Sequence, residues 1–205
     1  HRPNNTGQTT QAKQHRPNKK IDIHNAKPDF WITGYNRVGN QKSQTFPTAA
    51  LFGWYDKHGR DLPWRRRWPD LAPAYHVWLS EIMLQQTVVA TVIPYFLDFT
   101  RRWPTINDLA SAPLDDVLAA WAGLGYYARA RNLHKAAVMV ATEWGGQFSS
   151  DHRHANAVAD LRALPGVGPY TAGAIAAMAF GQQAVVVDGN IERLFSRYFA
   201  ITTPL

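Results

Sequence analysis

The chain has 205 residues, of which 45% are hydrophobic and 18% charged, enough for one folded domain with a core. Its formal net charge of +7 comes almost entirely from residues 1–50, where eight Lys and Arg stand against two Asp and Glu. The remaining residues are nearly neutral, so any affinity for nucleic acid must come from where their charges lie. The absence of cysteine excludes a disulfide scaffold and a thiolate metal site within this chain.

The N-terminal segment, residues 1–48, is rich in Asn, Gln, Thr, Lys and Pro and has no sustained hydrophobic period. We predict a disordered basic arm, or one that becomes ordered on a partner. No apolar run approaches the roughly 18 residues that a membrane-spanning helix needs, and no segment has the pattern of a signal peptide. These features predict an intracellular protein that does not enter the membrane.

From residue 49 onward the hydrophobic pattern is helical, and Gly and Pro mark where helices end. The expected helices span 51–59, 77–99, 105–110, 114–121, 128–144, 157–163, 170–180 and 188–198. Pro94 is expected to kink or break the second of them, and Gly181 to end the helix over 170–180. Only residues 184–187 suggest extended chain. The predicted class is all-α, with many short helices.

The segment Leu164-Pro165-Gly166-Val167-Gly168 has the composition of a tight hairpin between two helices. Pro165 ends the preceding helix, and Gly166 and Gly168 permit a positive φ and a close approach to a ligand. The amides of Val167, Gly168 and their neighbours would then point at a phosphate. An ordinary helix–helix turn also favours Gly and Pro, so the hairpin alone leaves both interpretations open.

Glu81 falls on one helical stripe with Val77, Leu84 and Val88, so apolar side chains are expected around it. Burial raises the pKa of a carboxyl group, which keeps a proton available near neutral pH and suits a general acid. The alternative is a Glu near a helix N-terminus that interacts with the helix dipole or caps with Ser80. The residues alone do not decide between the two.

Asp188 precedes Gly189-Asn190 and is expected to be the N-cap of the last helix. Capping hydrogen bonds would hold its carboxylate in place and keep it ionised. A fixed anion beneath a sugar lowers the barrier to an oxocarbenium-like transition state, so capping and catalysis are compatible roles.

Five collinear motifs resemble those of one enzyme family. They are Leu62-Pro63-Trp64-Arg65, Val77-Trp78-Leu79-Ser80-Glu81-Ile82-Met83-Leu84-Gln85-Gln86-Thr87, Gly123-Leu124-Gly125-Tyr126-Tyr127-Ala128-Arg129-Ala130-Arg131-Asn132-Leu133, the hairpin, and Val187-Asp188-Gly189-Asn190. Over about residues 50–203 the chain resembles the helix-hairpin-helix DNA glycosylase superfamily, and within it the A/G-specific adenine DNA glycosylases (the MutY family). The resemblance implies a catalytic domain over residues 49–205, with two lobes and the active-site cleft between them.

This resemblance implies a monofunctional DNA glycosylase of base excision repair. It would hydrolyse the N-glycosidic bond of adenine opposite 8-oxoguanine or guanine in double-stranded DNA. Glu81 would protonate the adenine at N7 and later help to activate water, and Asp188 would stabilise the sugar cation. Relatives that also cut the strand have a Lys where this chain has Tyr170, and a phenol cannot form an imine. Tyr170 is expected in the active site, with packing at a helix start as the alternative.

The resemblance assigns further residues to DNA. Gln86 and Tyr126 match positions that fill the gap left by an extruded base. The remaining substrate-binding residues are Trp64, Arg65 and Leu84, which match the adenine pocket, and Asn190. The phosphate contacts are expected from the residues themselves. They are Gly166, Val167 and Gly168 of the hairpin, and Arg129 and Arg131, which with Tyr126 and Tyr127 mix cationic and aromatic groups. Further candidates are Arg65, Arg66, Arg67, Arg101 and Arg102. The alternatives are a core position for Trp64, solvated helix residues at 85–86 and a solvated helix face at 129–131.

Two departures from the family pattern bear on the cofactor and on the opposite base. The family carries four cysteines for a [4Fe–4S] cluster soon after the last helix, and this chain has no cysteine. The family also has a C-terminal domain that helps to recognise 8-oxoguanine, and this domain is missing. We therefore expect a C-terminally truncated, monomeric member with no metal ligands of its own.

Two other functions remain as alternatives. One is an endonuclease III-like glycosylase for oxidised pyrimidines, which Tyr170 at the lysine position disfavours. The other is a helix-hairpin-helix DNA-binding module without catalysis, which the presence of both Glu81 and Asp188 disfavours.

Overall fold

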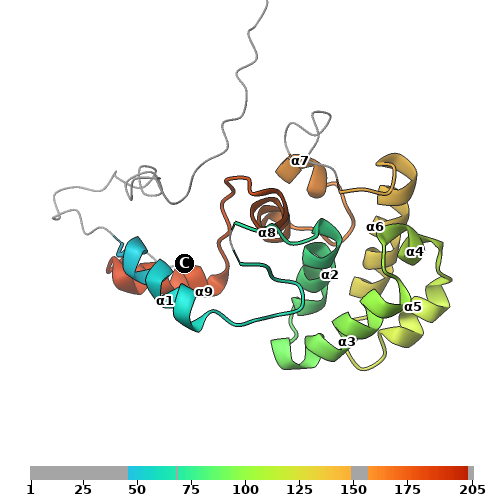
Figure 1. The fold of residues 1–205 in the computed structure, drawn as a ribbon, viewed down its shortest axis with the longest axis horizontal. Coiled ribbons are helices and arrows are strands. Elements are labelled where there is room, and N and C mark those ends of the chain that lie inside the picture. Colours follow the sequence, from blue (N-terminus) through green and yellow to red (C-terminus); the bar gives the residue numbers. More distant parts are fainter. Residues whose placement is uncertain (1–45, 68, 149–156, 203–205) are drawn as a thin grey trace, which may run out of the picture. The chain divides into compact units, whose positions relative to one another are not determined.

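The computed structural model describes residues 46–67, 69–148 and 157–202, and the expected arm over residues 1–48 lies almost wholly outside these ranges. The described residues form nine α-helices and no strand, which confirms the all-α class (Figure 1). The contacts divide the chain into two units after Gly59, and the first unit contains α1 (Thr48–His58). The predicted domain boundary at residue 49 stays a prediction, as do the two lobes and the cleft.

The second unit contains the other eight described helices. They are α2 (Ala74–Leu84), α3 (Val89–Arg102), α4 (Ile106–Ser111), α5 (Leu114–Ala120), α6 (Ala128–Glu143), α7 (Ala157–Leu161), α8 (Pro169–Phe180) and α9 (Gly189–Tyr198). Gly181 ends α8 in the left-handed conformation, with φ of 61°, as its sequence position predicts. No helix of the described ranges is both long and hydrophobic enough to cross a bilayer.

The prediction of one helix over 77–99 is wrong. The chain leaves the helical path between Leu84, the last residue of α2, and Val89, the first of α3. Gln86 has a φ of 58°, which lies outside the right-handed helical region. Pro94 lies inside α3 and does not end it. The break therefore follows from contacts around residues 85–87, described below, and not from the proline.

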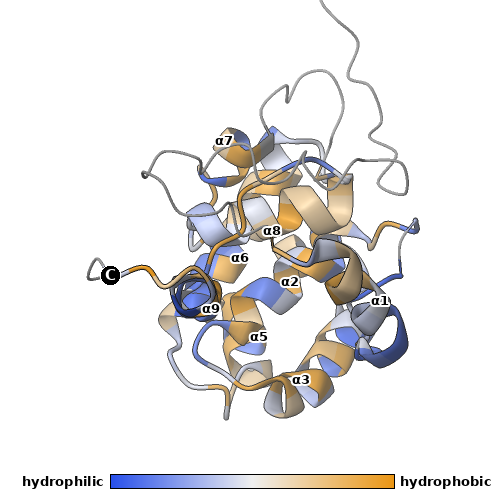
Figure 2. Ribbon diagram, turned by 90° about the vertical axis from the view of Figure 1, so that its left-hand side faces the viewer, coloured by the Kyte–Doolittle hydropathy of each residue, from blue (hydrophilic) through white to orange (hydrophobic). Residues whose placement is uncertain are grey.

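Helix α2 lies at the centre of the second unit and packs against α3, α6 and α8. It buries Trp78, Leu79 and Met83 completely, and small buried residues such as Ala172 and Ala176 let α8 lie close to it. Hydrophobic colour runs along α3 and α8, whereas α9 shows hydrophilic residues (Figure 2). The core thus holds α2 and the start of α8 in fixed positions.

Gly173 on α8 lets the chain that leads to Asp188 pass close to this helix. A Cβ atom at Gly173 would lie 2.8 Å from the carbonyl oxygen of Val185, a backbone atom that cannot rotate away. We expect Gly173→Ala to lower the free energy of unfolding by about 1–3 kcal/mol, as overpacking does, and to displace Asp188. Urea denaturation measures the loss.

The matched control is Gly53→Ala in α1, where a Cβ atom meets nothing within 4 Å. This variant is expected to be as stable as the parent, or more stable by up to about 1 kcal/mol. If Gly173→Ala behaves like Gly53→Ala, the close approach to Val185 does not constrain the chain ahead of Asp188.

Candidate active site

Glu81 is partly buried in the second half of α2, a helix that begins at Ala74. Val88, the last residue of the predicted apolar stripe, lies beyond the end of α2 and is 70% exposed. Burial raises the pKa of its carboxyl group from 4.5 to about 7, and the charge of Arg65 lowers it by a smaller amount. Glu81 is too far from the helix N-terminus for the dipole to act on it, and the hydroxyl of Ser80 donates to Val77 O. The structure thus excludes the capping alternative and leaves a carboxyl group that is half protonated near neutral pH.

Asp188 is the N-cap of α9, as its sequence position predicts. Its carboxylate accepts hydrogen bonds from the backbone N–H of Ile191 (2.8 Å) and Asn190 (3.0 Å) and from Asn190 Nδ2 (2.9 Å). The bond from Ile191 is the main cause of a pKa below the usual range, and the bonds from Asn190 act in the same direction. Asp188 is therefore an ionised and immobilised carboxylate.

Tyr170 relates these two carboxyl groups to each other. It is the second residue of α8, directly after the hairpin, and its side chain is 41% exposed. Burial raises the pKa of its phenol, and the charges of Glu81 and of Asp188 raise it further. Tyr170 thus lies within electrostatic reach of Glu81 on α2, which is half protonated near pH 7, and of the ionised Asp188 at the start of α9.

Arg65 is the cation next to this group. Its charge lowers the pKa of both Glu81 and Tyr170, so it lies near both side chains. Leu84 is partly buried at the end of α2. Trp64 is only 3% exposed and packs edge-on against Phe96, with 5.1 Å between the ring centroids. The indole of Trp64 is therefore packed in the hydrophobic core, and its place beside the substrate stays a prediction.

Gln86 and Tyr126 are both exposed, and both have a left-handed backbone, with φ of 58° and 47°. This conformation costs a residue with a Cβ atom roughly 1–3 kcal/mol, and it often marks a functional site. Tyr126 is 64% exposed although it is aromatic. Both side chains are therefore displayed to solvent by strained backbone, as insertion into a duplex would require.

The backbone N–H groups of the hairpin that are free to bind a phosphate differ from those predicted. Gly166 has a φ of 79°, but Gly168 is extended, with φ of −86°. The N–H of Val167 donates to Leu164 O at 3.1 Å, so Val167 cannot also hold a phosphate. Within the described ranges, the N–H groups of Gly168, Tyr170 and Thr171 have no hydrogen-bond acceptor. Free amides at a helix start favour an anion, so the phosphate contact predicted for the hairpin is expected at these three groups.

The family model described as "HhH-GPD superfamily base excision DNA repair protein" matches residues 79–204. The chain belongs to this superfamily. The matched residues include Glu81, Tyr170 and Asp188, so all three side chains lie within the superfamily domain.

Among curated relatives, the adenine DNA glycosylase of Homo sapiens is 49% identical over 174 residues, which cover 83% of this chain and 31% of that protein. The adenine DNA glycosylase of Buchnera aphidicola (strain Bp) is 43% identical over 153 residues, or 74% of this chain and 41% of that protein. The superfamily chain thus spans less than half the length of these relatives.

Solved structures of two DNA glycosylases share the fold. A thermostable thymine-DNA glycosylase has a TM-score of 0.63 and 27% identity, over 74% of this chain and 65% of that one. Endonuclease III trapped in a covalent DNA intermediate has a TM-score of 0.58 and 23% identity, over 71% of this chain and 63% of that one.

Arg129 is not a phosphate contact in the superfamily chain. Its side chain is buried, with the residue only 8% exposed, and its guanidinium donates to backbone carbonyls of α2. Arg129 was predicted to contact phosphate because cationic and aromatic residues alternate around it, a mixture that suits a phosphate-facing surface. Arg131 is exposed, and its phosphate contact stays a prediction.

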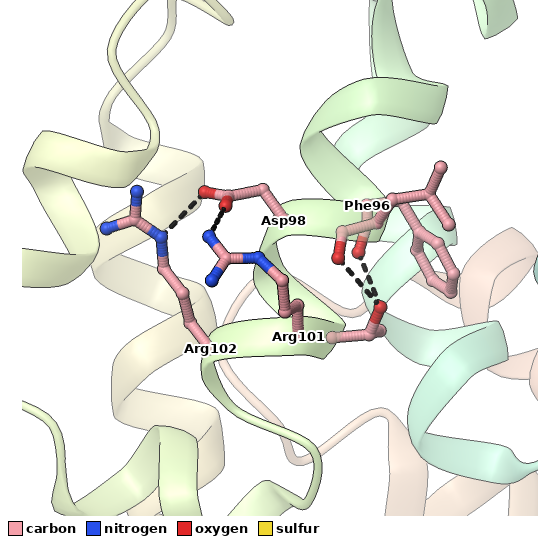
Figure 3. A network of polar contacts seen from close by, with 6 residues as sticks. Phe96, Asp98, Arg101 and Arg102 are labelled. Carbon is pink, nitrogen blue, oxygen red and sulfur yellow. Dashed lines mark hydrogen bonds and ion pairs between the residues drawn. The ribbon is translucent and has the colours of Figure 1, made fainter.

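Arg101 and Arg102, at the end of α3, are both paired with Asp98 (Figure 3). Arg102 Nε lies 2.7 Å from one carboxylate oxygen, and Arg101 Nη2 contacts the other. The hydrogen bond from Arg101 is the main cause of a lowered pKa for Asp98. Because one carboxylate neutralises part of this pair, the two arginines are poorer phosphate contacts than their sequence suggests.

The iron–sulfur cluster that the resemblance implies does not fit the residues present. A [4Fe–4S] cluster is held by thiolates, and the superfamily chain contains no cysteine. In the described ranges, no group of three or more His, Asp or Glu could hold a metal ion either. We therefore derive the chemistry from the side chains alone.

Gln85 makes a contact with the hairpin that the sequence did not predict. Its side-chain Nε2 donates to Gly166 O at 3.1 Å and so joins the end of α2 to the hairpin. The two residues are 81 positions apart, and no local pattern indicates that they meet.

Proposed function

We propose that this chain carries the catalytic site of a monofunctional DNA glycosylase that removes adenine opposite 8-oxoguanine or guanine from double-stranded DNA. One observation carries the proposal: Glu81 and Asp188 both lie close enough to Tyr170 that each, when ionised, raises the pKa of its phenol. A protonated acid and a fixed anion are the two groups that hydrolysis of a glycosidic bond needs. Similarity to adenine DNA glycosylases at 41–51% identity supports adenine as the base.

The chemistry assigns one role to each carboxyl group. Glu81 donates its proton to N7 of adenine as the bond between N9 and C1′ breaks, and the electron pair of that bond leaves with the base. Asp188 stabilises the positive charge that develops on the sugar. Water then attacks C1′ and gives its proton to the carboxylate of Glu81, which restores the acid.

Within the described part of the chain, no lysine stands at the position after the hairpin from which an amine could attack the sugar. Tyr170 stands directly after the hairpin, and its phenol cannot form the imine through which a lyase cuts the strand. The described lysines, Lys57 and Lys135, lie on α1 and α6 and not at the start of α8 or α9. The product is therefore an intact strand with an abasic site.

This proposal predicts that strand cleavage depends on alkali. A duplex with adenine opposite 8-oxoguanine is incubated with the chain, and half of the sample is then treated with hot alkali. We expect the adenine strand to be cut in the treated half only, as seen on a denaturing gel. A cut without alkali would identify a lyase, and no cut by a chain that still binds the duplex would identify a binding module.

The partner that follows from this activity is double-stranded DNA, bound by a monomer inside the cell. We expect the amides at the start of α8 and the exposed Arg131 to contact phosphates. Arg65 and Asn190 are expected to contact the substrate, and Leu84, at the end of α2, to contact the base.

A further inference from the structure

The guanidinium of Arg129 holds the C-terminal end of α2. Its Nη1 donates to Met83 O at 2.8 Å, to Ile82 O at 3.3 Å and to Gln85 O. These carbonyls face the end of the helix, where intrahelical partners run out and a cation is favoured. Arg129 therefore stabilises the break after Leu84 at which the chain turns toward Gln86.

The other nitrogen of the same guanidinium holds a second loop. Nη2 donates to Leu124 O at 2.9 Å and to Gly125 O at 3.3 Å, and also to Thr87 Oγ1 at 3.1 Å. The guanidinium carbon lies 5.6 Å from the ring centroid of Tyr126, a distance at which a cation and an aromatic face attract each other. One side chain thus contacts residues 85–87 and residues 124–126, which we call the wedge loops.

Each wedge loop displays one exposed residue with a left-handed backbone, Gln86 in the first and Tyr126 in the second. Backbone of this kind persists only where the surrounding contacts determine it. Three of the six acceptors of Arg129 belong to residues directly next to these two, namely Gln85, Thr87 and Gly125. Arg129 is therefore the common support of both strained positions.

We propose that Arg129 is a positioning residue that holds Gln86 and Tyr126 at a fixed separation, so that both enter the duplex together when the adenine leaves the stack. This inference rests on the proposed function. Arginine suits the role because its planar fork reaches acceptors on both loops, whereas the single ammonium of lysine cannot span them. Gln85 extends the same support to the hairpin through Gly166 O.

A double-mutant cycle tests the inference. Single-turnover rates of adenine removal are measured for the parent chain, Arg129→Lys, the pair Gln86→Ala/Tyr126→Ala, and the triple variant. We expect Arg129→Lys to slow the parent at least 10-fold but to slow the Gln86→Ala/Tyr126→Ala chain less than 2-fold, because the residues that Arg129 positions are already gone. Equal losses in both backgrounds would mean that Arg129 acts on the whole fold, and the inference would be wrong.

A second measurement follows base extrusion without chemistry. 2-Aminopurine replaces the target adenine, and its fluorescence rises when the base unstacks on binding. We expect Arg129→Lys to lose most of this rise while Kd for the duplex changes less than 3-fold. Arg197→Lys, the same change at an exposed arginine of α9, is expected to match the parent in both measurements. A full fluorescence rise for Arg129→Lys would overturn the inference.

Thr87→Val replaces Arg129→Lys if the lysine variant does not fold, as judged by circular dichroism. It removes one acceptor and leaves the guanidinium in place, and it is expected to reduce the fluorescence rise in the same direction. No reduction would overturn the inference. If the parent chain neither removes adenine nor unstacks 2-aminopurine, both the proposed function and the inference are wrong. If the parent is active but the losses from Arg129→Lys and from Gln86→Ala/Tyr126→Ala are additive, only the inference is wrong.

Discussion

Glu81→Gln is expected to slow adenine removal at least about 100-fold, the lower bound for losing a general acid. The substitution keeps the size of the side chain and removes the proton that the leaving base requires. Single-turnover kinetics at pH 7 measure the loss, since they report chemistry apart from product release. Binding of the duplex is expected to persist, because Glu81 lies among apolar neighbours and not at a phosphate position.

The pH profile distinguishes an acid from a residue that only shapes the site. Because the pKa of Glu81 is about 7, the parent chain should remove adenine more slowly as the pH rises from 6 to 8. The residual rate of Glu81→Gln should not show this fall. A parallel fall in both chains would mean that another group titrates, and Glu81 would lose its role.

The same pKa has a consequence for stability that serves as a control. A carboxyl group with a pKa of 4.5 when unfolded and about 7 when folded stabilises the fold below pH 4.5, and this contribution is lost as the pH rises through 7. The shift corresponds to roughly 3 kcal/mol. Glu81→Gln should therefore unfold at higher urea concentration than the parent at pH 8, with little difference at pH 4. A Glu81→Gln variant that is more stable than the parent at pH 8 would exclude misfolding as the cause of its lost activity.

Asp188→Asn is expected to slow adenine removal by roughly 100-fold or more, because it removes the negative charge that faces the sugar. Asparagine is as good an N-cap as aspartate, so α9 should keep its start. The hydrogen bonds from the N–H groups of Asn190 and Ile191 can pass to the amide oxygen. Single-turnover kinetics and circular dichroism together measure activity and helix content.

Asp188→Ala separates the two roles of this residue. It removes both charge and cap, so it should lose the same activity and in addition about 1 kcal/mol of stability. If Asp188→Asn retained the rate of the parent, the carboxylate would serve α9 alone, and the proposed stabilisation of the sugar would be wrong.

The features that were predicted correctly from the sequence depend on contacts between residues a few places apart in the chain. Asp188 caps α9 because the amides it binds belong to residues two and three places later. Gly181 ends α8 through its own left-handed φ. In each case the neighbours along the chain determine the conformation, so the pattern is visible without a structure.

Other positions depended on groups distant in the chain. The break after Leu84 was missed because the guanidinium that supports it comes from Arg129, 44 residues beyond Gln85. Arg129 itself was misassigned because nothing near it in the sequence shows that acceptors from two loops would surround it. The packing of Trp64 against Phe96 on α3 is likewise a contact that its sequence neighbours do not indicate.

The sequence by itself thus determined the all-α class, the superfamily motifs, the capped Asp188 and the acidic residue on α2. Only the tertiary structure decided that Tyr170 lies near the carboxyl groups of both Glu81 and Asp188. It alone also decided that the buried Arg129 supports both wedge loops. The physical reason is the separation along the chain between the residues that interact. Capping and helical periodicity act between residues a few places apart, whereas desolvation and a shared guanidinium depend on which distant segments the folded core brings together.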